Sequence, residues 1–317
     1  VASPPISTAG RLIARLKILA ALDIADRRLP QDGRLRVLTS GRKSVDLRIS
    51  TLPTLWGEKA VLRVLDQERT QMQLDSLGMF PEQQQLFRQA LESSQGMILV
   101  TGPTGSGKSV TLYSALQHLN DTRRNIATAE DPVELHVNGV NQVQVKPAIG
   151  LTFPTVLRAF LRQDPDIIMV GEIRDRETAE IAVKAAQTGH LVLSTLHTNS
   201  AIEAVTRLLG MGVKPYNLVA SLRLVIAQRL VRKLCKHCRR PQSLGPAELS
   251  LFGFTEAPAI PVYRATECDR CHGGYRGRIG IYEVVPITDP MTRIIIAGGN
   301  SMELAEQVRG AGVSSLR

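Results

Sequence analysis

The segment from Gly102 to Ser109 has the residue types and spacing needed to hold the phosphates of a nucleotide. It follows the P-loop pattern and lies between a predicted strand and a predicted helix. Its glycines let backbone N–H groups face phosphate oxygens, while Lys108 can reach the β- and γ-phosphates and Ser109 can ligate Mg²⁺. The predicted nucleotide-binding residues are Gly102, Pro103, Thr104, Gly105, Ser106, Gly107, Lys108 and Ser109.

A hydrolase of nucleotides also needs a group that orients or deprotonates water at the γ-phosphate. Glu172 suits this role because it ends an apolar strand predicted at 166–171. Many P-loop ATPases carry a metal-supporting aspartate just before this glutamate, where this chain has Gly171. We therefore expect another carboxylate, Glu130 or Asp131 at the end of a neighbouring strand, to assist the metal. The alternative for that acidic segment is a solvated turn.

Two histidines, His190 and His197, frame the strand predicted at 191–196. They are seven residues apart, and the two-residue period of a strand places them on opposite faces, so they cannot share a metal ion. We expect one to sense the nucleotide and the other to be a packing or capping residue.

The four cysteines of the chain form two Cys-x-x-Cys pairs, Cys235 with Cys238 and Cys268 with Cys271. Four thiolates complete a tetrahedral shell with no open position for water, which predicts structural Zn²⁺. A redox site would need only one such pair. The basic flanks of the pairs fit a zinc ribbon that binds nucleic acid, or a protein docking surface. Tyr263 and Tyr275 are the only aromatic residues nearby. Because few aromatic side chains can stack on bases, nucleic acid is disfavoured as a partner.

The elements that must position these residues fall into two groups. The spacing of apolar residues predicts a helix over 8–25, and alternation predicts strands over 34–39, 44–51 and 58–66, with turns at Asp32-Gly33 and at Gly41. We expect these residues to form a small α+β unit over 1–70, followed by a linker at 71–75.

From residue 76 to 317 the pattern changes to apolar strands alternating with helices. Strands are predicted at 97–101, 126–130, 166–171 and 191–196, which indicates a mainly parallel α/β sheet. A Cys-, Arg- and Pro-rich stretch over about 229–278 is too irregular for this pattern, and we expect it to be an insert organised by the metal.

Composition excludes several broad classes. The 317 residues are enough for about two domains, and 43% hydrophobic with 21% charged residues excludes a wholly disordered or fibrous chain. The apolar runs fall well short of the ~18 residues that span a bilayer. The chain begins at Val1 without a secretion signal, so we expect a cytosolic protein whose true N-terminus is missing. The net charge of +10 fits nucleic acid, anionic lipid or a phosphate-rich ligand.

Taken together, the motifs resemble the ATPase family that powers type II secretion and type IV pilus assembly, the GspE and PilB type. The resemblance runs from about Leu22 to Val285. Besides the P-loop and the four cysteines, the matching motifs are Arg28–Gly33, the Asp box Ala129–Glu134, Leu161–Asp166, Gly171–Asp175 and the His box Thr188–Thr198.

The resemblance implies a RecA-like P-loop ATPase core with a PAS-like N-terminal unit and a zinc-binding tetracysteine insert. It implies that Glu172 is the catalytic glutamate, that Glu130 helps to hold Mg²⁺ or its water, and that His190 and His197 couple nucleotide state to structure. Arg48 and Arg63 match family arginines that approach the nucleotide, although both also fit exposed strand positions.

The same resemblance implies a cytoplasmic hexamer that attaches to an inner-membrane platform and uses ATP to drive pilus or pseudopilus assembly. The family's far N-terminal docking domain and its last helices are absent from 1–317. Two other classes stay open at this stage. One is a zinc-ribbon P-loop nucleic-acid-binding protein, and the other is a scaffold that binds ATP but hardly hydrolyses it.

Overall fold

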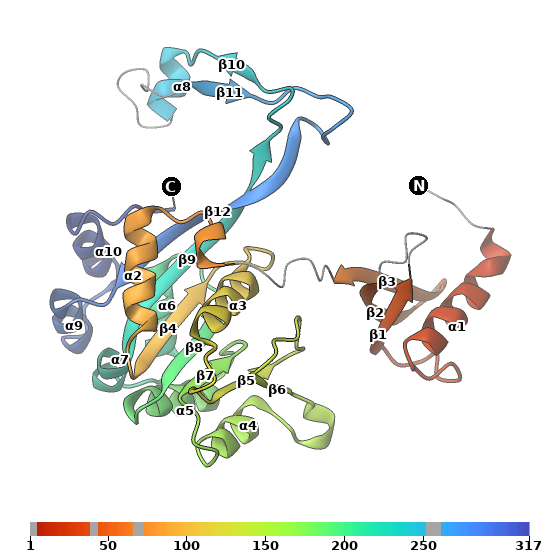
Figure 1. The fold of residues 1–317 in the computed structure, drawn as a ribbon, viewed down its shortest axis with the longest axis horizontal. Helices are drawn as coiled ribbons and strands as arrows, with labels where there is room; N and C mark the ends of the chain where they lie inside the picture. Colours follow the sequence, from red (N-terminus) through yellow and green to blue (C-terminus); the bar gives the residue numbers. More distant parts are fainter. Residues whose placement is uncertain (1–4, 39–43, 66–72, 252–260, 317) are drawn as a thin grey trace. The chain divides into compact units, whose positions relative to one another are not determined.

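The structure is a computed structural model, and it describes residues 5–38, 44–65, 73–251 and 261–316. The chain forms two compact units, the first made of residues 1–71 with 134–136 and the second of residues 72–133 with 137–317. Figure 1 shows the elements of both. Thr39, Gly41, Asp66 and the first two residues of the predicted linker, Gln71 and Met72, lie outside the described residues.

The first unit is one helix on one face of a three-stranded antiparallel sheet. Helix α1 (Ala9–Leu19) follows a short 3₁₀ turn, and β1 (Gln31–Leu38), β2 (Ser44–Thr54) and β3 (Gly57–Leu65) pair in chain order. Leu35, Ile49 and Ala20 form its core. The predicted α+β character of this unit is therefore correct, and the helix ends earlier than expected because Ala21 takes a left-handed conformation with φ of 54°.

The turn predicted at Asp32-Gly33 is wrong, because both residues lie inside β1 and Gly33 pairs with Ile49. A Cβ at Gly33 would lie 2.9 Å from the carbonyl oxygen of Ala20 and 2.9 Å from the Leu22 side chain. Glycine is present here because the chain leaving α1 crosses the strand closely, so it serves packing and not chain reversal.

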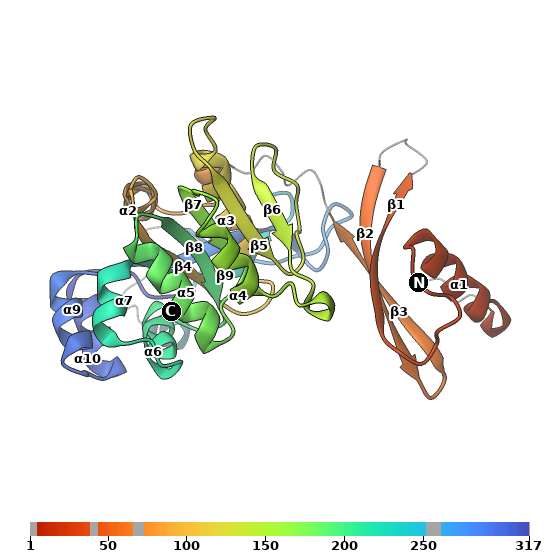
Figure 2. The ribbon, with the colours of Figure 1, turned by 90° about the horizontal axis from the view of Figure 1, so that it is seen from below.

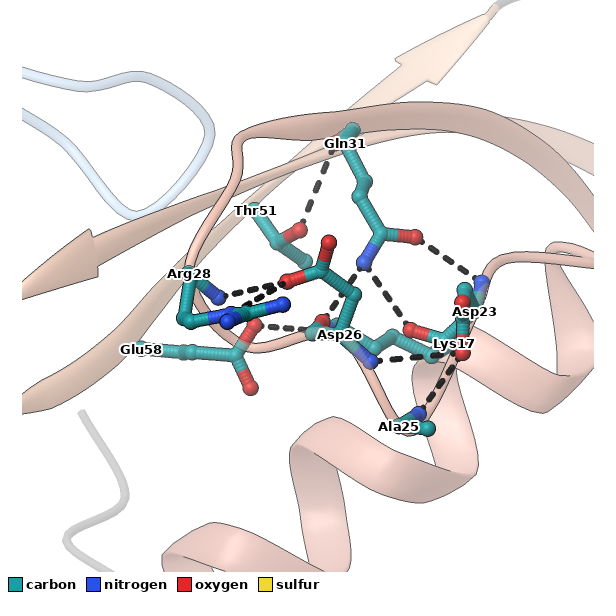
Figure 3. A network of polar contacts seen from close by, with 8 residues as sticks. All are labelled: Lys17, Asp23, Ala25, Asp26, Arg28, Gln31, Thr51 and Glu58. Atoms are coloured by element: carbon teal, nitrogen blue, oxygen red, sulfur yellow. Dashed lines mark hydrogen bonds and ion pairs between the residues drawn. The ribbon is translucent and has the colours of Figure 1, made fainter.

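The segment between α1 and β1 is fastened by a buried lysine (Figure 3). The Lys17 side chain is 1% exposed, and its Nζ donates to the Asp26 carbonyl at 2.8 Å and lies 2.5 Å from Oε1 of Glu58. Gln31 donates to the carbonyls of Asp23 and Asp26 at 2.9 and 2.8 Å. Because a buried charge is costly unless paired and hydrogen-bonded, this network ties the segment to both α1 and β3.

The second unit is built on a sheet whose described strands run in the order β12-β9-β4-β8-β7-β5-β6. All neighbouring pairs are parallel except β12 with β9. The predicted mainly parallel α/β sheet is thus confirmed. The strands are β4 (Gly96–Thr101), β5 (Ile126–Glu130), β6 (Asn141–Gln144), β7 (Ile167–Val170), β8 (Leu191–Leu196), β9 (Leu222–Leu234) and β12 (Tyr275–Pro286).

Helices cover both faces of this sheet (Figure 2). Met97 and Leu99 of β4 join the main core with residues of the helices after β7 and β8, whereas helix α3 packs against β4 from the other side. The helices are α2 (Pro81–Leu91), α3 (Lys108–Leu119), α4 (Phe153–Phe160), α5 (Arg176–Gln187), α6 (Ala201–Gly210), α7 (Pro215–Ser221), α9 (Asp289–Ile296) and α10 (Ser301–Gly310). In the described residues no helix is both long and apolar enough to cross a bilayer.

Strands β9 and β12 leave the sheet together as a long ribbon, at whose far end lie the cysteines (Figure 1). The small elements β10 (Arg240–Gln242), α8 (Pro246–Leu251) and β11 (Val262–Arg264) complete that end. The stretch 229–278 therefore begins and ends in regular strand, with its irregular part between Cys235 and Gly274.

Candidate functional site

The P-loop joins the carboxyl end of β4, a central strand buried along its whole length, to α3, which begins at Lys108. Gly102, Gly105 and Gly107 all have positive φ, at 151°, 79° and 92°. A Cβ at Gly102 would lie 2.5 Å from the Gln228 carbonyl oxygen, so no larger residue fits there. No side chain caps the start of α3, so its first N–H groups and the helix dipole face outward, which suits an anion.

Lys108 lies folded back onto the loop that precedes it. Its Nζ donates to the carbonyl oxygens of Gly102 at 2.8 Å and Pro103 at 3.2 Å. Burial lowers the pKa of Lys108, while the nearby charge of Glu172 acts in the opposite direction. These carbonyls keep the ammonium group at the mouth of the loop, where it can exchange them for phosphate oxygens.

Glu172 follows the carboxyl end of β7, which is separated from β4 by β8 alone. Its carboxylate contacts the guanidinium of Arg174, and its Oε2 lies 3.6 Å from Nε2 of His197. Arg174 also lies 3.7 Å from Asp131. Burial lowers the pKa of His197, with the Lys108 charge acting the same way. The imidazole beside Glu172 is therefore neutral near pH 7.

Glu130 is buried at the carboxyl end of β5, and three side chains donate to its carboxylate. The donors are the Tyr113 hydroxyl, Thr128 Oγ1 at 2.6 Å and Gln142 Nε2 at 3.0 Å. The alternative of a solvated turn is therefore wrong for Glu130, which is buried at the end of a strand. These three hydrogen bonds fix the orientation of the Glu130 side chain.

The two histidines lie at opposite ends of β8. His197 follows the carboxyl end and reaches Glu172. His190 precedes the amino end, where its carbonyl accepts from the Gly96 N–H at 3.1 Å and its Nδ1 lies 3.0 Å from the Ala185 carbonyl. The structure does not bring His190 to the P-loop, since the whole strand separates them. Of the two roles expected for this pair, capping fits His190.

Arg48 and Arg63 lie directly opposite each other on β2 and β3, with Arg34 of β1 next in the same row. Arg48 lies 3.8 Å from Asp32. Both predicted arginines belong to the first unit and the P-loop belongs to the second, so their approach to a nucleotide stays a prediction.

Sequence reasoning missed Arg174 and Tyr113. Arg174 stands two residues after Glu172 at a strand end, which is a signal that a charged side chain shares the site. Nothing local marks Tyr113, since it reads as one more apolar position of α3, and only the fold places its hydroxyl against Glu130.

The four cysteine sulfurs come together at the end of the β9–β12 ribbon, and all lie within 4.8 Å of one another. The separations are 3.9 Å for Cys235 to Cys268 and 3.6 Å for both Cys238 and Cys268 to Cys271. A regular tetrahedron of sulfurs at ~2.3 Å from zinc has edges of about 3.8 Å. None of the four is in a disulfide. Backbone N–H groups of His237 and Cys238 lower the pKa of Cys235 to about 7, which favours its thiolate. The donor set fits Zn²⁺.

The two tyrosines beside this centre are each covered by an arginine. The guanidinium of Arg232 lies 4.0 Å from the ring centre of Tyr275, and that of Arg239 lies 4.3 Å from the ring centre of Tyr263. A ring face engaged in such a cation–π contact is not available to stack on a base.

Comparison with known sequences identifies close relatives. Residues 1–317 match the family described as Type II/IV secretion system protein. The chain is 57% identical to the type IV pilus assembly ATPase PilB of Pseudomonas aeruginosa, over 100% of this chain and 56% of that protein. It is 50% identical to type II secretion system protein E of the same organism, over 99% of this chain and 62% of that protein. It thus spans little more than half the length of these relatives.

Solved structures agree on the fold. The ATPase DotB of Legionella pneumophila aligns with a TM-score of 0.68 at 21% identity, over 98% of this chain and 78% of that one. The pilus retraction motor PilT, solved with bound ADP, aligns with a TM-score of 0.62 at 28% identity, over 91% of this chain and 76% of that one. These alignments confirm the fold expected for the P-loop core. The sequence matches confirm the resemblance drawn from the motifs, and the chain belongs to the type II/IV secretion system protein family.

Proposed function

We propose that the second unit binds ATP at the P-loop and hydrolyses it with Glu172 as the catalytic base. The observation that carries this proposal is the geometry of the sheet. It places the uncapped start of α3, Lys108 and the Glu172 carboxylate at the carboxyl ends of β4 and β7, on one edge of the sheet. Ligands of open α/β sheets bind at that edge.

In this reading the loop amides and Lys108 hold the β- and γ-phosphates, while Glu172 orients a water molecule and takes its proton. The guanidinium of Arg174 contacts Oε1 of Glu172, so this contact must open before that oxygen can orient the water molecule. We assign His197 the sensor role, because its ring lies 3.6 Å from Oε2 of Glu172.

Mg²⁺, when bound, neutralises charge that develops on the phosphates. The residues present fit such an ion, because Ser109 is exposed at the start of α3 and Glu130 is a buried carboxyl group at the end of β5. The three donors that orient Glu130 favour contact with the ion through a water molecule. We assign Zn²⁺ at the four cysteines a structural role, since four thiolates leave no open ligand position.

At the level of the whole protein we propose an oligomeric motor, a hexamer, that works with inner-membrane components of pilus assembly or type II secretion. The support is the identity to relatives named as type IV pilus assembly ATPase and type II secretion system protein E. In such a motor we assign Arg48 and Arg63 the role of arginines that approach a bound nucleotide. A cytoplasmic location follows from this role.

The alternative of a nucleic-acid-binding zinc ribbon has less support, because Tyr263 and Tyr275 are covered. Steep loss of nucleic-acid binding with rising salt would favour it.

The test of the proposed function is Lys108→Ala in the zinc-loaded chain. We expect loss of ADP binding and of ATP turnover by about a hundredfold or more, since no other cation lies in the loop. Lys184→Ala on α5, an exposed lysine away from the loop, is the matched control. Normal binding and turnover by Lys108→Ala would remove the P-loop from the mechanism.

A further inference from the structure

Gln228 is a buried amide in a strand that is otherwise apolar along its buried half. It lies on β9, 1% exposed, one residue beyond Ala227, which pairs with Thr101 at the end of β4. An unpaired amide in such a place is costly, so its contacts explain its presence.

Both ends of this amide are used, and both contacts hold the phosphate-binding segment. Gln228 Nε2 donates to the Ser106 carbonyl at 2.8 Å. Gln228 Oε1 accepts from Thr111 Oγ1, in the first turns of α3, also at 2.8 Å. One side chain therefore fastens the loop and the helix that follows it.

The bond to Ser106 also sets the direction of the next N–H group. In a planar trans peptide the C=O and N–H bonds point in opposite directions. Because the Ser106 carbonyl points toward the Gln228 amide on β9, the N–H of Gly107, on the other side of the same peptide, points away from that amide. This is the direction in which a P-loop N–H must point to meet a phosphate.

The glycines of the loop lie against the same residue. A Cβ at Gly102 would lie 2.5 Å from the Gln228 backbone oxygen, and a Cβ at Gly107 would lie 3.2 Å from Gln228 Nε2. Gln228 therefore packs closely against Gly102 and Gly107, and this packing restricts the conformation of the loop.

We propose that Gln228 is a positioning residue for phosphate binding: its amide holds the Ser106–Gly107 peptide so that the Gly107 N–H is aimed at the phosphates before a nucleotide arrives. The proposal rests on the proposed function of the P-loop. It predicts that Gln228 affects ground state and transition state alike, since the aimed N–H meets phosphate in both. Loss of the amide therefore raises KM and the Kd of ADP without a matching loss of kcat.

The experiment uses Gln228→Met in the zinc-loaded chain, which keeps the length of the side chain and removes both hydrogen bonds. We expect the Kd of ADP, measured by calorimetry, and the KM of ATP to rise together by about tenfold or more, with kcat within about threefold of wild type. The control is Ile226→Val, a buried change two residues earlier on the same strand, for which both constants stay within about twofold. Melting temperatures of both variants are measured in parallel.

A second pair of variants keeps the test decisive if Gln228→Met does not fold. Thr111→Val removes the partner of Oε1 and is expected to raise the Kd of ADP, while Thr111→Ser restores the hydroxyl and the affinity. Unchanged Kd and KM in Gln228→Met or, where that variant does not fold, in Thr111→Val overturn the proposal, as does a fall confined to kcat. Loss of ADP binding in Lys108→Ala with full binding in Gln228→Met sinks this inference alone, whereas full binding in Lys108→Ala sinks the proposed function itself.

Discussion

Strand β9 contacts the P-loop with its first half and leads to the four cysteines with its second half, and the two halves differ in burial. Its first half, Leu222 to Gln228, is buried between β4 and β12 except at Arg223, and it supports the P-loop. Its second half, from Arg229 onward, is largely exposed and leads to Cys235. Around the cysteines the described elements are two strands of three residues each and one short helix.

The difference concerns what fixes the geometry of each centre. At the P-loop, strands buried on both faces and the Gln228 amide set the backbone before any ligand binds. Among the described residues from Cys235 to Gly274, Cys235 is the only hydrophobic residue that is buried, so the proposed zinc ion would supply the free energy that orders this end. The first centre is therefore expected to survive loss of its ligand, and the second is not.

The largest effect is expected from Glu172→Gln at the P-loop site. The change keeps the shape of the side chain and removes the base, so turnover should fall by about 10²- to 10⁴-fold with ADP affinity retained. Glu180→Gln on α5 is the control, because it removes a carboxylate that pairs with the exposed Arg176. Loss of ADP binding in Glu172→Gln would show that this residue holds the loop and not the water.

The next largest effect is expected from Arg63→Ala, which tests whether the P-loop site needs a residue of the first unit. Arg63→Ala should lower kcat by about tenfold or more and change ADP affinity little, because an arginine that meets the γ-phosphate acts in the transition state. Lys59→Ala on the same face of β3 is the control. Turnover per chain should also rise as protein concentration brings chains together. Constant turnover across the range where light scattering detects oligomers would contradict activation by assembly.

Zinc removal tests the comparison directly. Chelation, or Cys235→Ser, should make the segment between Cys235 and Gly274 sensitive to protease while the Kd of ADP changes by less than about twofold. Elemental analysis should find one Zn²⁺ per chain. If loss of zinc weakens ADP binding as strongly as it exposes the cysteine end, the two halves of β9 do not behave independently.

The smallest effect concerns His197. Burial lowers its pKa below the usual 6.5, so the unfolded chain takes up this proton at a higher pH than the folded chain does. Stability contributed by the neutral ring is therefore present above about pH 6.5 and is lost as the pH falls below it. His197→Gln should flatten this dependence. Thermal unfolding of both proteins at pH 5.5 and pH 8 measures it, and equal pH dependence would assign the acid sensitivity elsewhere.

The sequence predicts the elements of the large sheet well, because periodicity and burial agree there. The strands at Ile126–Glu130 and Leu191–Leu196 begin and end where apolar runs do. The cysteine pairs and the P-loop are likewise local patterns.

Residues whose roles depend on distant partners escaped sequence reasoning. In the sequence Tyr113 looks like one more apolar position of its helix, and Gln228 is a polar residue after an apolar run. Their partners, Glu130 and Ser106, are known only from the fold. The turn assigned to Gly33 failed for the same reason, since the need for glycine comes from Ala20, thirteen positions earlier in the chain.

The borders of the large sheet bear on how copies of this chain can associate. Strand β6, at one border, has four residues, three of them amides. At the other border, Gln83 of α2 donates to the Tyr282 carbonyl of β12 at 2.8 Å, and the Tyr282 hydroxyl donates to the Leu77 carbonyl at 3.0 Å. A short polar border and a border already fastened to its own chain both discourage edge-to-edge strand addition. When copies of this chain associate, neither edge of the sheet therefore favours pairing with a strand of another copy, which opposes fibril formation.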